Sequence, residues 1–282
     1  MPPETAGTTD PAAAAEDPAA AFFRRGWCVF PQDLDILAWA KAAQPVAARL
    51  AADPGQQAAW LRCGGTWYAG VNAFPNGPDG GVPEAGVPPL SGAPMRFVVE
   101  VLNLPDMALD AAQISVCYPG YPRQGTEETE AAFRFRRDRD AAHVDGLIRQ
   151  PPARRRWLGE THGFVLGIPL GDTAPGAAPL VVWEGSHEIM RDAFQARFAG
   201  IPPEAWAAED ITECYTEARR TCFEVCPRVE VSAALGGAYL VHRLALHGVA
   251  PWSGPETEPR AIAYFRPDPF PGVPPDWWLA LR

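Results

Sequence analysis

The stretch GGAYLVHRLALHGV (236–249), followed after a turn-rich connection by RAIAYFRP (260–267), decides the fold class of this 282-residue chain. Both segments are rich in β-branched and aromatic residues and lie beside glycine or proline, a pattern typical of β-strands. Four earlier segments have the same character: AAQISVCYPGYP (111–122), GFVLGIPL (163–170), APLVVWEGSH (178–187) and RVEVSA (228–233). Short strands separated by turns predict an antiparallel sandwich or jelly roll rather than alternating βαβ units.

Helical segments lie before and within this β region. Residues 33–54 carry apolar side chains at helical spacing, begin with aspartate and end at proline, and residues 89–105 predict a second helix. Residues 21–31 predict a short strand. Residues 188–227 predict helices inserted between two strands, as either a lid over a site or a subunit interface.

These elements predict a mainly β fold with α-helices, formed as a single domain over residues 21–282. We expect residues 21–110 to form a helical support and residues 111–267 to form the jelly-roll core that carries the insertion. The acidic N-terminal stretch, residues 1–20, has no early basic residue, so it predicts a disordered tail rather than a signal peptide.

Composition narrows the possible partners. The net charge of −10 and the sequence pI near 5.0 argue against nucleic acid as the main partner. No apolar run is long enough to span a bilayer, so we expect a cytoplasmic protein with no membrane partner. The six cysteines form no C-x-x-C pair and predict free buried thiols. Composition does not indicate an oligomeric state.

A His-x-Asp pair, His143 and Asp145, is the first indication of a metal site. If residues 141–147 are extended, the two side chains share one face of a strand. The third ligand must come from the four remaining histidines. These are His162, His187, His242 and His247. We expect His162 and His187 to be loop or capping residues, because His162 lies at the start of a strand segment and His187 lies where a turn leads into the inserted helices.

The choice between His242 and His247 depends on strand pairing. Folding the last two strands as a hairpin centred near residue 254 puts Arg260 opposite residue 248 or 249. His247 is then its close neighbour, and His242 lies roughly 16 Å away. Two histidines and one carboxylate form the facial arrangement of non-haem Fe(II) oxygenases, and a buried arginine pairs bidentately with a carboxylate co-substrate.

On these residues the chain resembles the phytanoyl-CoA dioxygenase-like family of Fe(II)/2-oxoglutarate-dependent oxygenases. The resemblance is carried by HVDGL (143–147), GIPLGDTAPGAAPLVVWEGSH (167–187), VHRLALHGVAPW (241–252) with Arg260, and the opening RRGWCVFPQDLD (24–35). It implies a double-stranded β-helix, or jelly roll, with Fe(II) bound by His143, Asp145 and His247. It also implies that Arg260 holds the distal carboxylate of 2-oxoglutarate, with Gln113 as a further polar contact and no direct metal contact from His242.

The function implied by the resemblance is hydroxylation of a small molecule. Fe(II), O₂ and 2-oxoglutarate take part, and 2-oxoglutarate is oxidatively decarboxylated to succinate and CO₂. Members of the family that halogenate lack a carboxylate at the position of Asp145, so oxygen transfer is expected here. Two alternatives stay open. One is a cupin-like metal-dependent isomerase or oxygenase that does not use 2-oxoglutarate, and the other is a non-catalytic sensor of metal or 2-oxoglutarate.

An arginine cluster flanks the His-x-Asp pair. Its members are Arg134, Arg136, Arg137, Arg139, Arg149, Arg154, Arg155 and Arg156. One interpretation is an electropositive rim that attracts an anionic substrate. The other is a solvated loop balanced by nearby acids. Those acids are Glu127, Glu128, Glu130, Asp138 and Asp140. We favour the solvated loop on sequence alone.

Overall fold

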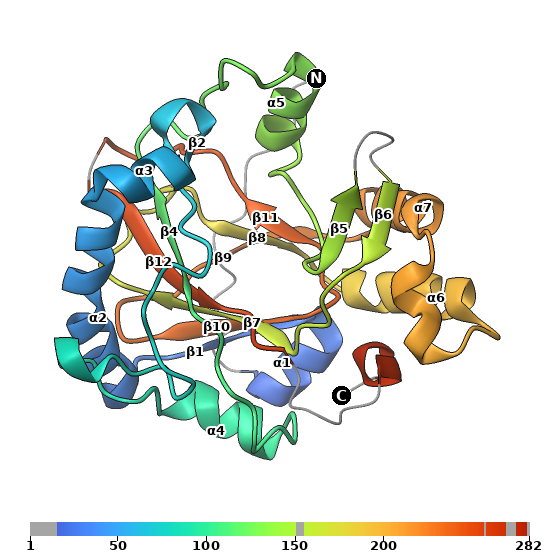
Figure 1. The fold of residues 1–282 in the computed structure, drawn as a ribbon, viewed down its shortest axis with the longest axis horizontal. Coiled ribbons are helices and arrows are strands. Elements are labelled where there is room, and N and C mark those ends of the chain that lie inside the picture. The colour runs from blue at the N-terminus through green and yellow to red at the C-terminus, as the bar shows by residue number, and fades with distance from the viewer. Residues whose placement is uncertain (1–15, 151–154, 257, 269–274, 281–282) are drawn as a thin grey trace.

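The computed structural model describes residues 16–150, 155–256, 258–268 and 275–280, and its strands form two facing antiparallel sheets beside a separate ribbon (Figure 1). The major sheet, in spatial order, contains β1 (Trp27–Phe30), β10 (Ala238–His242), β7 (Phe164–Pro169), β12 (Arg260–Phe265), β4 (Gln113–Cys117), β3 (Trp67–Tyr68) and β2 (Leu61–Arg62). The minor sheet contains β11 (His247–Val249), β8 (Leu180–Trp183) and β9 (Arg228–Val231). The ribbon pairs β5 (Leu147–Gln150) with β6 (Arg155–Leu158).

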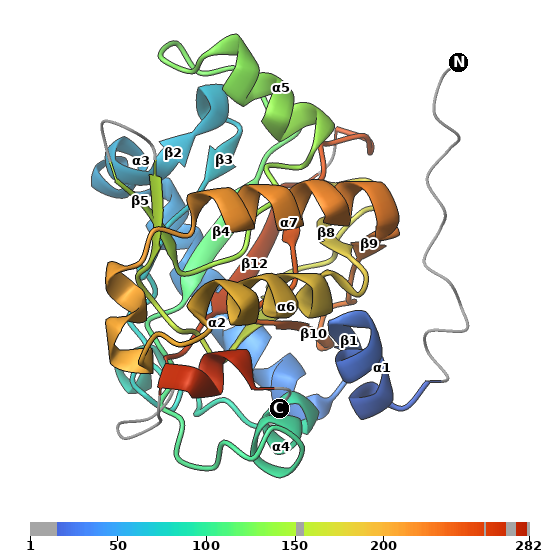
Figure 2. The same cartoon turned by 90° about the vertical axis from the view of Figure 1, so that its right-hand side faces the viewer.

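Helices cover the outer faces of both sheets. They are α1 (Pro18–Arg25), α2 (Leu34–Ala52), α3 (Pro54–Trp60), α4 (Ala93–Glu100), α5 (Glu130–Asp138), α6 (Ser186–Phe198) and α7 (Thr212–Val225). Short 3₁₀ turns span Cys63–Gly65, Pro83–Ala85, Pro203–Ala208 and Pro275–Leu279. Figure 2 shows α6 and α7 side by side across one face of the molecule, with α5 above them. None of the helices within the described ranges is long and apolar enough to cross a membrane.

Alternation along the strands divides the core into layers. In β12, Ile262 and Tyr264 pack between the two sheets, whereas Ala263 and Phe265 face the N-terminal helices. On the far side of the minor sheet, Trp183 packs with the α6–α7 layer. Because both faces of these strands are covered, their sequences are almost continuously apolar. The six strand segments expected from sequence all form strands, and the two facing sheets confirm the jelly-roll type of fold.

The N-terminal region differs from the expectation. The short strand expected within residues 21–31 forms at Trp27–Phe30, as β1. Residues 18–25 form a helix instead, because Asp17 accepts a hydrogen bond from Ala20 N at 3.1 Å and Gly26 ends the helix at φ +83°. Helix therefore replaces the expected tail at residues 18–20, and residues 1–15 lie outside the described part of the chain. Besides the expected β1, the helical support also supplies β2 and β3 to the major sheet, which the sequence did not predict.

The predicted hairpin between the last two strands is wrong. The run 238–249 breaks at a turn after His242, so that β10 lies in the major sheet and β11 in the minor one. Strand β12 then returns to the major sheet, where Arg260 pairs with Cys117 of β4. The connection between β11 and β12 therefore crosses from one sheet to the other, and the hairpin argument for choosing His247 fails. The helical insertion is present, and its first helix begins at Ser186.

The start of α2 gives a test of how the helical layer is fixed. Asp33 accepts hydrogen bonds from Asp35 N at 2.9 Å and from Ala93 N, at the start of α4, at 2.9 Å. We expect Asp33→Ala to lower the free energy of unfolding by about 1–2 kcal/mol, measured by urea denaturation. Asp35→Ala is the matched control, and equal losses in the two variants would contradict this role.

The same variant has a predicted pH dependence. Burial raises the pKa of Asp33, but the backbone hydrogen bonds from Ala93, Asp35 and Ile36 outweigh it and hold that pKa below its ordinary value. A lowered pKa means that the carboxylate stabilises the fold above the pKa of the unfolded chain. The stability gap between wild type and Asp33→Ala should therefore narrow as the pH falls below about 4.

Candidate metal centre

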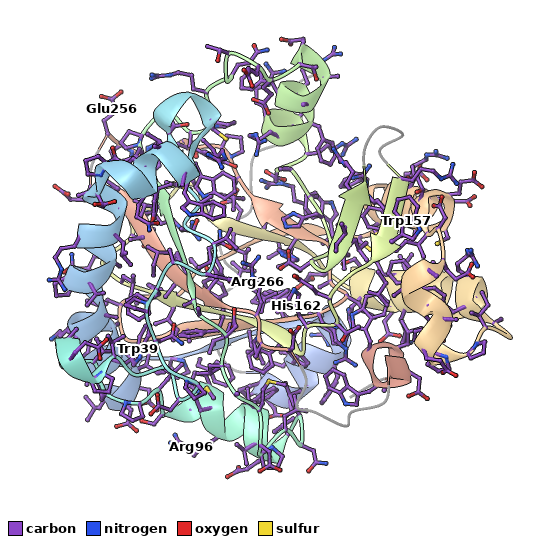
Figure 3. The ribbon with its side chains drawn as sticks, in the orientation of Figure 1. Trp39, Arg96, Trp157, His162, Glu256 and Arg266 are labelled. Carbon is purple, nitrogen blue, oxygen red and sulfur yellow. The ribbon has the colours of Figure 1, made fainter. Side chains whose placement is uncertain are left out.

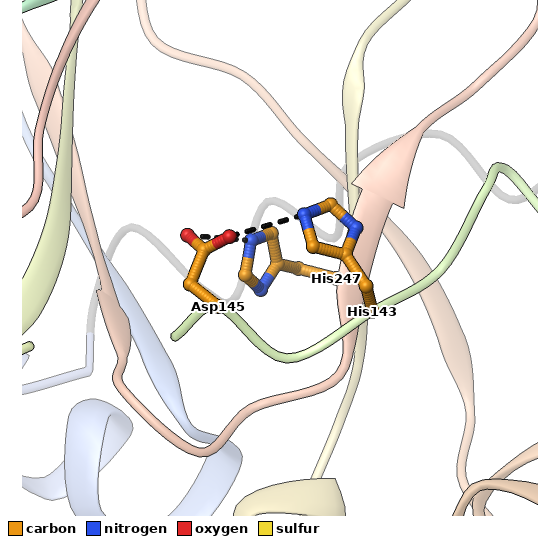
Figure 4. Close-up of side chains that lie close together, drawn as sticks. All are labelled: His143, Asp145 and His247. Atoms are coloured by element: carbon orange, nitrogen blue, oxygen red, sulfur yellow. Dashed lines mark ion pairs between the residues drawn. The ribbon is translucent and has the colours of Figure 1, made fainter. Parts of the chain in front are cut away.

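Three side chains converge where the His-x-Asp segment meets the minor sheet (Figure 4). His143 Nε2 lies 3.1 Å from Asp145 Oδ1, and His247 Nε2 lies 3.5 Å from Asp145 Oδ2. Their possible ligand atoms all lie within 4.8 Å of one another, and no second such group is present in the part of the chain that the structure describes. Two imidazoles and one carboxylate thus form one potential metal site.

Backbone pairing brings the two histidines together across the sequence. His143 N donates to His247 O at 2.8 Å, and His247 N donates to His143 O at 3.0 Å, which forms an isolated antiparallel bridge. Each ring is then fixed by its own chain. Nδ1 of His143 lies 3.0 Å from Ala141 O, and Nδ1 of His247 lies 2.9 Å from Ala245 O. A carbonyl oxygen only accepts, so each Nδ1 carries a proton, and Nε2 is the atom of each ring that faces Asp145 and could bind a metal.

The His-x-Asp segment is only partly extended, in contrast to the expectation for residues 141–147. His143 lies in the single bridge, and Asp145 already belongs to a turn with Gly146. Gly146 has φ +79°, and a Cβ there would lie 2.1 Å from Glu160 O. The turn therefore requires glycine, and it orients Asp145 toward both imidazoles before β5 begins.

Electrostatics keep Asp145 ionised although its side chain is only 10% exposed. Burial raises the pKa of Asp145, but the hydrogen bonds from His143 and His247 outweigh it and hold that pKa well below the ordinary value. Arg266 adds a positive charge, with Nη1 3.7 Å from Asp145 Oδ2. Figure 3 shows Arg266 near the centre of the molecule in that view, far from the peripheral Arg96.

A cavity of about 200 Å³ opens beside the triad. Its wall includes Gln113 and Ser115 of β4, Tyr264 of β12, and Trp67, whose Nε1 donates to Ser115 Oγ at 3.0 Å. Gln113 was expected to contact a co-substrate from a strand entering the core. The structure places it in the wall of the triad cavity, 8% exposed.

Arg260 is the first residue of β12, on the same face as Ile262 and Tyr264, and it lines a separate cavity together with Tyr239 and Ile262. Its side chain is buried, and Nη2 donates to Tyr264 Oη at 3.0 Å and to Tyr239 Oη at 3.4 Å. Nη1 has no hydrogen-bond partner among the described residues. Arg260 does not line the triad cavity itself, but it contacts that cavity's wall through Tyr264.

No counter-charge for Arg260 is present among the residues described. Burial raises the pKa of the adjacent Cys117 thiol to about 11, and burial raises the pKa of Tyr239 well above its ordinary value, so both groups stay neutral. A buried guanidinium without a counter-charge is costly, and it indicates a place for an anion.

The other histidines lie away from the triad. His162 is a loop residue as expected, 3.0 Å from Glu160 and 3.4 Å from Asp268. His187 is buried in the first turn of α6 rather than in a loop, with its ring 4.9 Å from that of His242. His242 is fully enclosed by the N-terminal helical layer, and its Nδ1 accepts from Leu244 N at 3.1 Å.

Sequence reasoning missed Tyr264 and Arg266, although a signal was present. In RAIAYFRP, residues 260, 262, 264 and 266 are two apart and share one face of a strand. It also missed that the ring of Tyr239 lies over Gly167, where an added Cβ would come within 2.1 Å of the ring. All six cysteines are free as expected, but Cys214 and Cys226 are partly exposed.

No protein-family model and no curated protein sequence matches the chain. Similar solved structures include AviO1 from Streptomyces viridochromogenes Tue57, at 17% identity and a TM-score of 0.49, covering 95% of this chain and 98% of that one. The non-heme alpha ketoglutarate dependent carbocyclase SnoK from nogalamycin biosynthesis is similar at 13% identity and a TM-score of 0.45, covering 93% and 89%. EctD from S. alaskensis with 2-oxoglutarate and 5-hydroxyectoine is similar at 20% identity and a TM-score of 0.44, covering 98% and 87%. At 13–20% identity no residue role is carried across, so the function follows from the site's own residues.

The triad predicts that the protein binds one Fe(II) per chain under anaerobic conditions, measured by equilibrium dialysis and metal analysis. His247→Ala removes one ligand and should weaken this binding at least about 100-fold. His162→Ala removes an imidazole outside the site and serves as the control. One tightly bound iron in His247→Ala would contradict the assignment.

Proposed function

We propose that this protein is an Fe(II)- and 2-oxoglutarate-dependent oxygenase that hydroxylates a small molecule. The observation that carries the proposal is the combination of two buried features that Tyr264 connects, because Tyr264 lines the triad cavity and its hydroxyl contacts Arg260. One is the group of His143, Asp145 and His247 with both Nε2 atoms available. The other is Arg260, a buried guanidinium with an unpartnered nitrogen.

The triad suits Fe(II). Imidazole and carboxylate are ligands that Fe(II) accepts, and three protein ligands leave coordination positions for a co-substrate and O₂. With iron bound, the centre supplies O₂ activation coupled to the oxidative decarboxylation of 2-oxoglutarate to succinate and CO₂. Cysteine ligands, which favour zinc or iron–sulfur clusters, are absent from the described group.

The surroundings of Arg260 suit the distal carboxylate of 2-oxoglutarate. A guanidinium binds a carboxylate bidentately, and the tyrosine hydroxyl that Arg260 contacts, from Tyr264, belongs to a residue lining the triad cavity. Gln113 lies opposite Tyr264 in the β4–β12 pair and offers an amide to the same molecule. One end of the co-substrate is then held by Arg260 and the other is placed toward the metal ligands.

The remaining wall positions the substrate and excludes water. Trp67, Val165 and Leu180 give the cavity an apolar lining beside the triad, which limits the access of water to the reacting atoms. Arg266 holds the Asp145 carboxylate from the side of β12. Because Asp145 is present and ionised, it can occupy the ligand position that a halogenase leaves to halide, and this supports hydroxylation as the outcome.

A ligand-binding experiment tests the proposal. Adding Fe(II) and then 2-oxoglutarate to the anaerobic protein should produce the weak visible charge-transfer band of the chelated co-substrate. Arg260→Met keeps the side-chain volume but removes the charge, so it should raise the 2-oxoglutarate concentration needed for half of the band by about 100-fold. The same variant should unfold at the same or a higher temperature, because an uncompensated buried charge is removed.

The outcomes separate the alternatives. No band in the wild type with iron bound would contradict the use of 2-oxoglutarate and favour a metal enzyme without it. A band without succinate formation after O₂ is admitted would favour a non-catalytic sensor. If Arg260→Met reaches half of the band at the same 2-oxoglutarate concentration as the wild type, Arg260 does not bind 2-oxoglutarate.

A further inference from the structure

Another cavity, of about 520 Å³, adjoins the triad on its outer side. It lies between α5, the β5–β6 ribbon and α7, and four arginines line it: Arg136, Arg149, Arg156 and Arg219. Arg136 is paired with Glu128, which leaves three guanidinium groups without a carboxylate partner among the described residues. His143 lines both this cavity and the smaller one, and the His143 side chain is 44% exposed. The arginine-lined cavity therefore leads directly to one proposed metal ligand.

Two of its arginines face each other in the ribbon. Arg149 of β5 is paired directly with Arg156 of β6, so their side chains lie on the same face. Like charges directly opposite one another destabilise a strand pair, and a two-stranded ribbon has little other stabilisation. The ribbon is fixed instead from outside, where Arg156 N donates to Thr212 Oγ1 at 2.8 Å and Ile211 N donates to Arg156 O at 3.0 Å.

The third arginine reaches the cavity from α7. The Arg219 guanidinium lies 4.9 Å from the ring centre of Phe135 and 5.3 Å from that of Tyr215. The Arg156 guanidinium also lies over the Tyr215 ring, at 4.9 Å from its centre. Burial lowers the pKa of Arg156, and the nearby charges of Arg149 and Arg219 lower it further. Aromatic faces therefore hold the guanidinium groups of Arg156 and Arg219 close together despite their repulsion.

The three groups have no carboxylate partner in the described ranges, and the neighbouring residues 151–154, PPAR, contain no acid. Other arginines of the cluster are paired, as the solvated-loop interpretation expects. Arg136 is paired with Glu128, Arg137 with Asp138, and Arg155 with Asp210. Among the described residues, the guanidinium groups of Arg149, Arg156 and Arg219 make a single hydrogen bond, from Arg156 Nη1 to Leu147 O at 3.4 Å. Arg149 is exposed, as the solvated-loop interpretation expects, but neither Arg149 nor the half-buried Arg156 is balanced by an acid among the described residues.

We propose that Arg149, Arg156 and Arg219 form an oxyanion site that holds a phosphoryl or carboxylate group of the small-molecule substrate. A guanidinium group can bind either a phosphoryl or a carboxylate group with two parallel hydrogen bonds, and the negative charge of a bound anion would reduce the repulsion between Arg149 and Arg156. The part of the substrate beyond the oxyanion then extends past His143 toward the triad. This last step rests on the proposed function, whereas anion binding by the three arginines does not.

The test uses isothermal titration of the protein loaded anaerobically with Fe(II) and 2-oxoglutarate. The probes are phenyl phosphate, benzoate and the uncharged benzyl alcohol. Phenyl phosphate should bind saturably and benzyl alcohol should not. Arg149→Gln and Arg219→Gln should each weaken phenyl phosphate binding about 10-fold or more. Tighter binding of phenyl phosphate than of benzoate identifies a phosphoryl group, and equal binding identifies a carboxylate as sufficient.

Two further variants keep the result interpretable. Arg220→Gln makes the same charge change at the next position of α7, which is exposed and outside the cavity wall, and should bind phenyl phosphate like the wild type. Arg149→Glu places a carboxylate opposite Arg156, so it should melt at or above the wild-type temperature and yet lose anion binding.

Several outcomes would overturn the oxyanion site: no binding of either anion, equal binding of benzyl alcohol, or binding unchanged in Arg149→Glu and Arg219→Gln. Probe binding that shifts the charge-transfer band and is as tight in the Arg149 variants as in the wild type would place the anion on iron. That result would also overturn the oxyanion site. The band itself reports on Fe(II) and 2-oxoglutarate before any probe is added. Loss of the band therefore counts against the proposed function, and loss of probe binding counts against the oxyanion site.

Discussion

The site depends on one reciprocal pair of backbone hydrogen bonds, between His143 and His247. This pair attaches an otherwise irregular segment to the edge strand of the minor sheet, more than 100 residues further along the sequence. Gly248 allows the close approach, because a Cβ there would lie 2.1 Å from Asp140 O. With the segment attached in this way, the turn at Gly146 orients the Asp145 carboxylate toward the imidazoles of His143 and His247.

Two buried arginines, Arg243 and Arg260, differ in how their hydrogen-bonding groups are satisfied. Arg243 is 4% exposed, and its guanidinium donates to three backbone carbonyls, of Trp277, Trp278 and Ala280, at 2.8–3.0 Å. Its charge is thus distributed over the C-terminal 3₁₀ turn and ties that turn to the end of β10. Arg260, buried to the same degree, keeps one nitrogen without a partner and contacts neutral hydroxyls. The two arginines thus differ in how many of their N–H groups have hydrogen-bond partners, not in how deeply they are buried. For this reason we propose a bound ligand at Arg260 and none at Arg243.

Local pattern in the sequence was enough for the strands, for helix α2 with its Asp33 cap, and for the spacing of His143 and Asp145. It was not enough for strand partners. The run 238–249 looks like one strand, because a turn made of Arg243, Leu244 and Ala245 carries no glycine or proline. The resulting hairpin argument named His247 for a wrong reason, since β11 and β12 lie in different sheets. Arg219 could not be associated with Arg149 either, because only the packing of α7 against the ribbon brings them together.

The arrangement of positive charge follows from the chain's acidity. With a net charge of −10, the protein as a whole repels anions, and long-range steering does not favour an anionic substrate. Screening reduces that repulsion beyond about 10 Å at ordinary salt, whereas contacts within a cavity are screened much less. An acidic protein that acts on anions must therefore concentrate guanidinium groups at short range. The two proposed anion sites, Arg260 beside Tyr264 and the trio of Arg149, Arg156 and Arg219 beside His143, meet this requirement. In the function proposed here, two anionic reactants are thus held by different arginines and share no binding group.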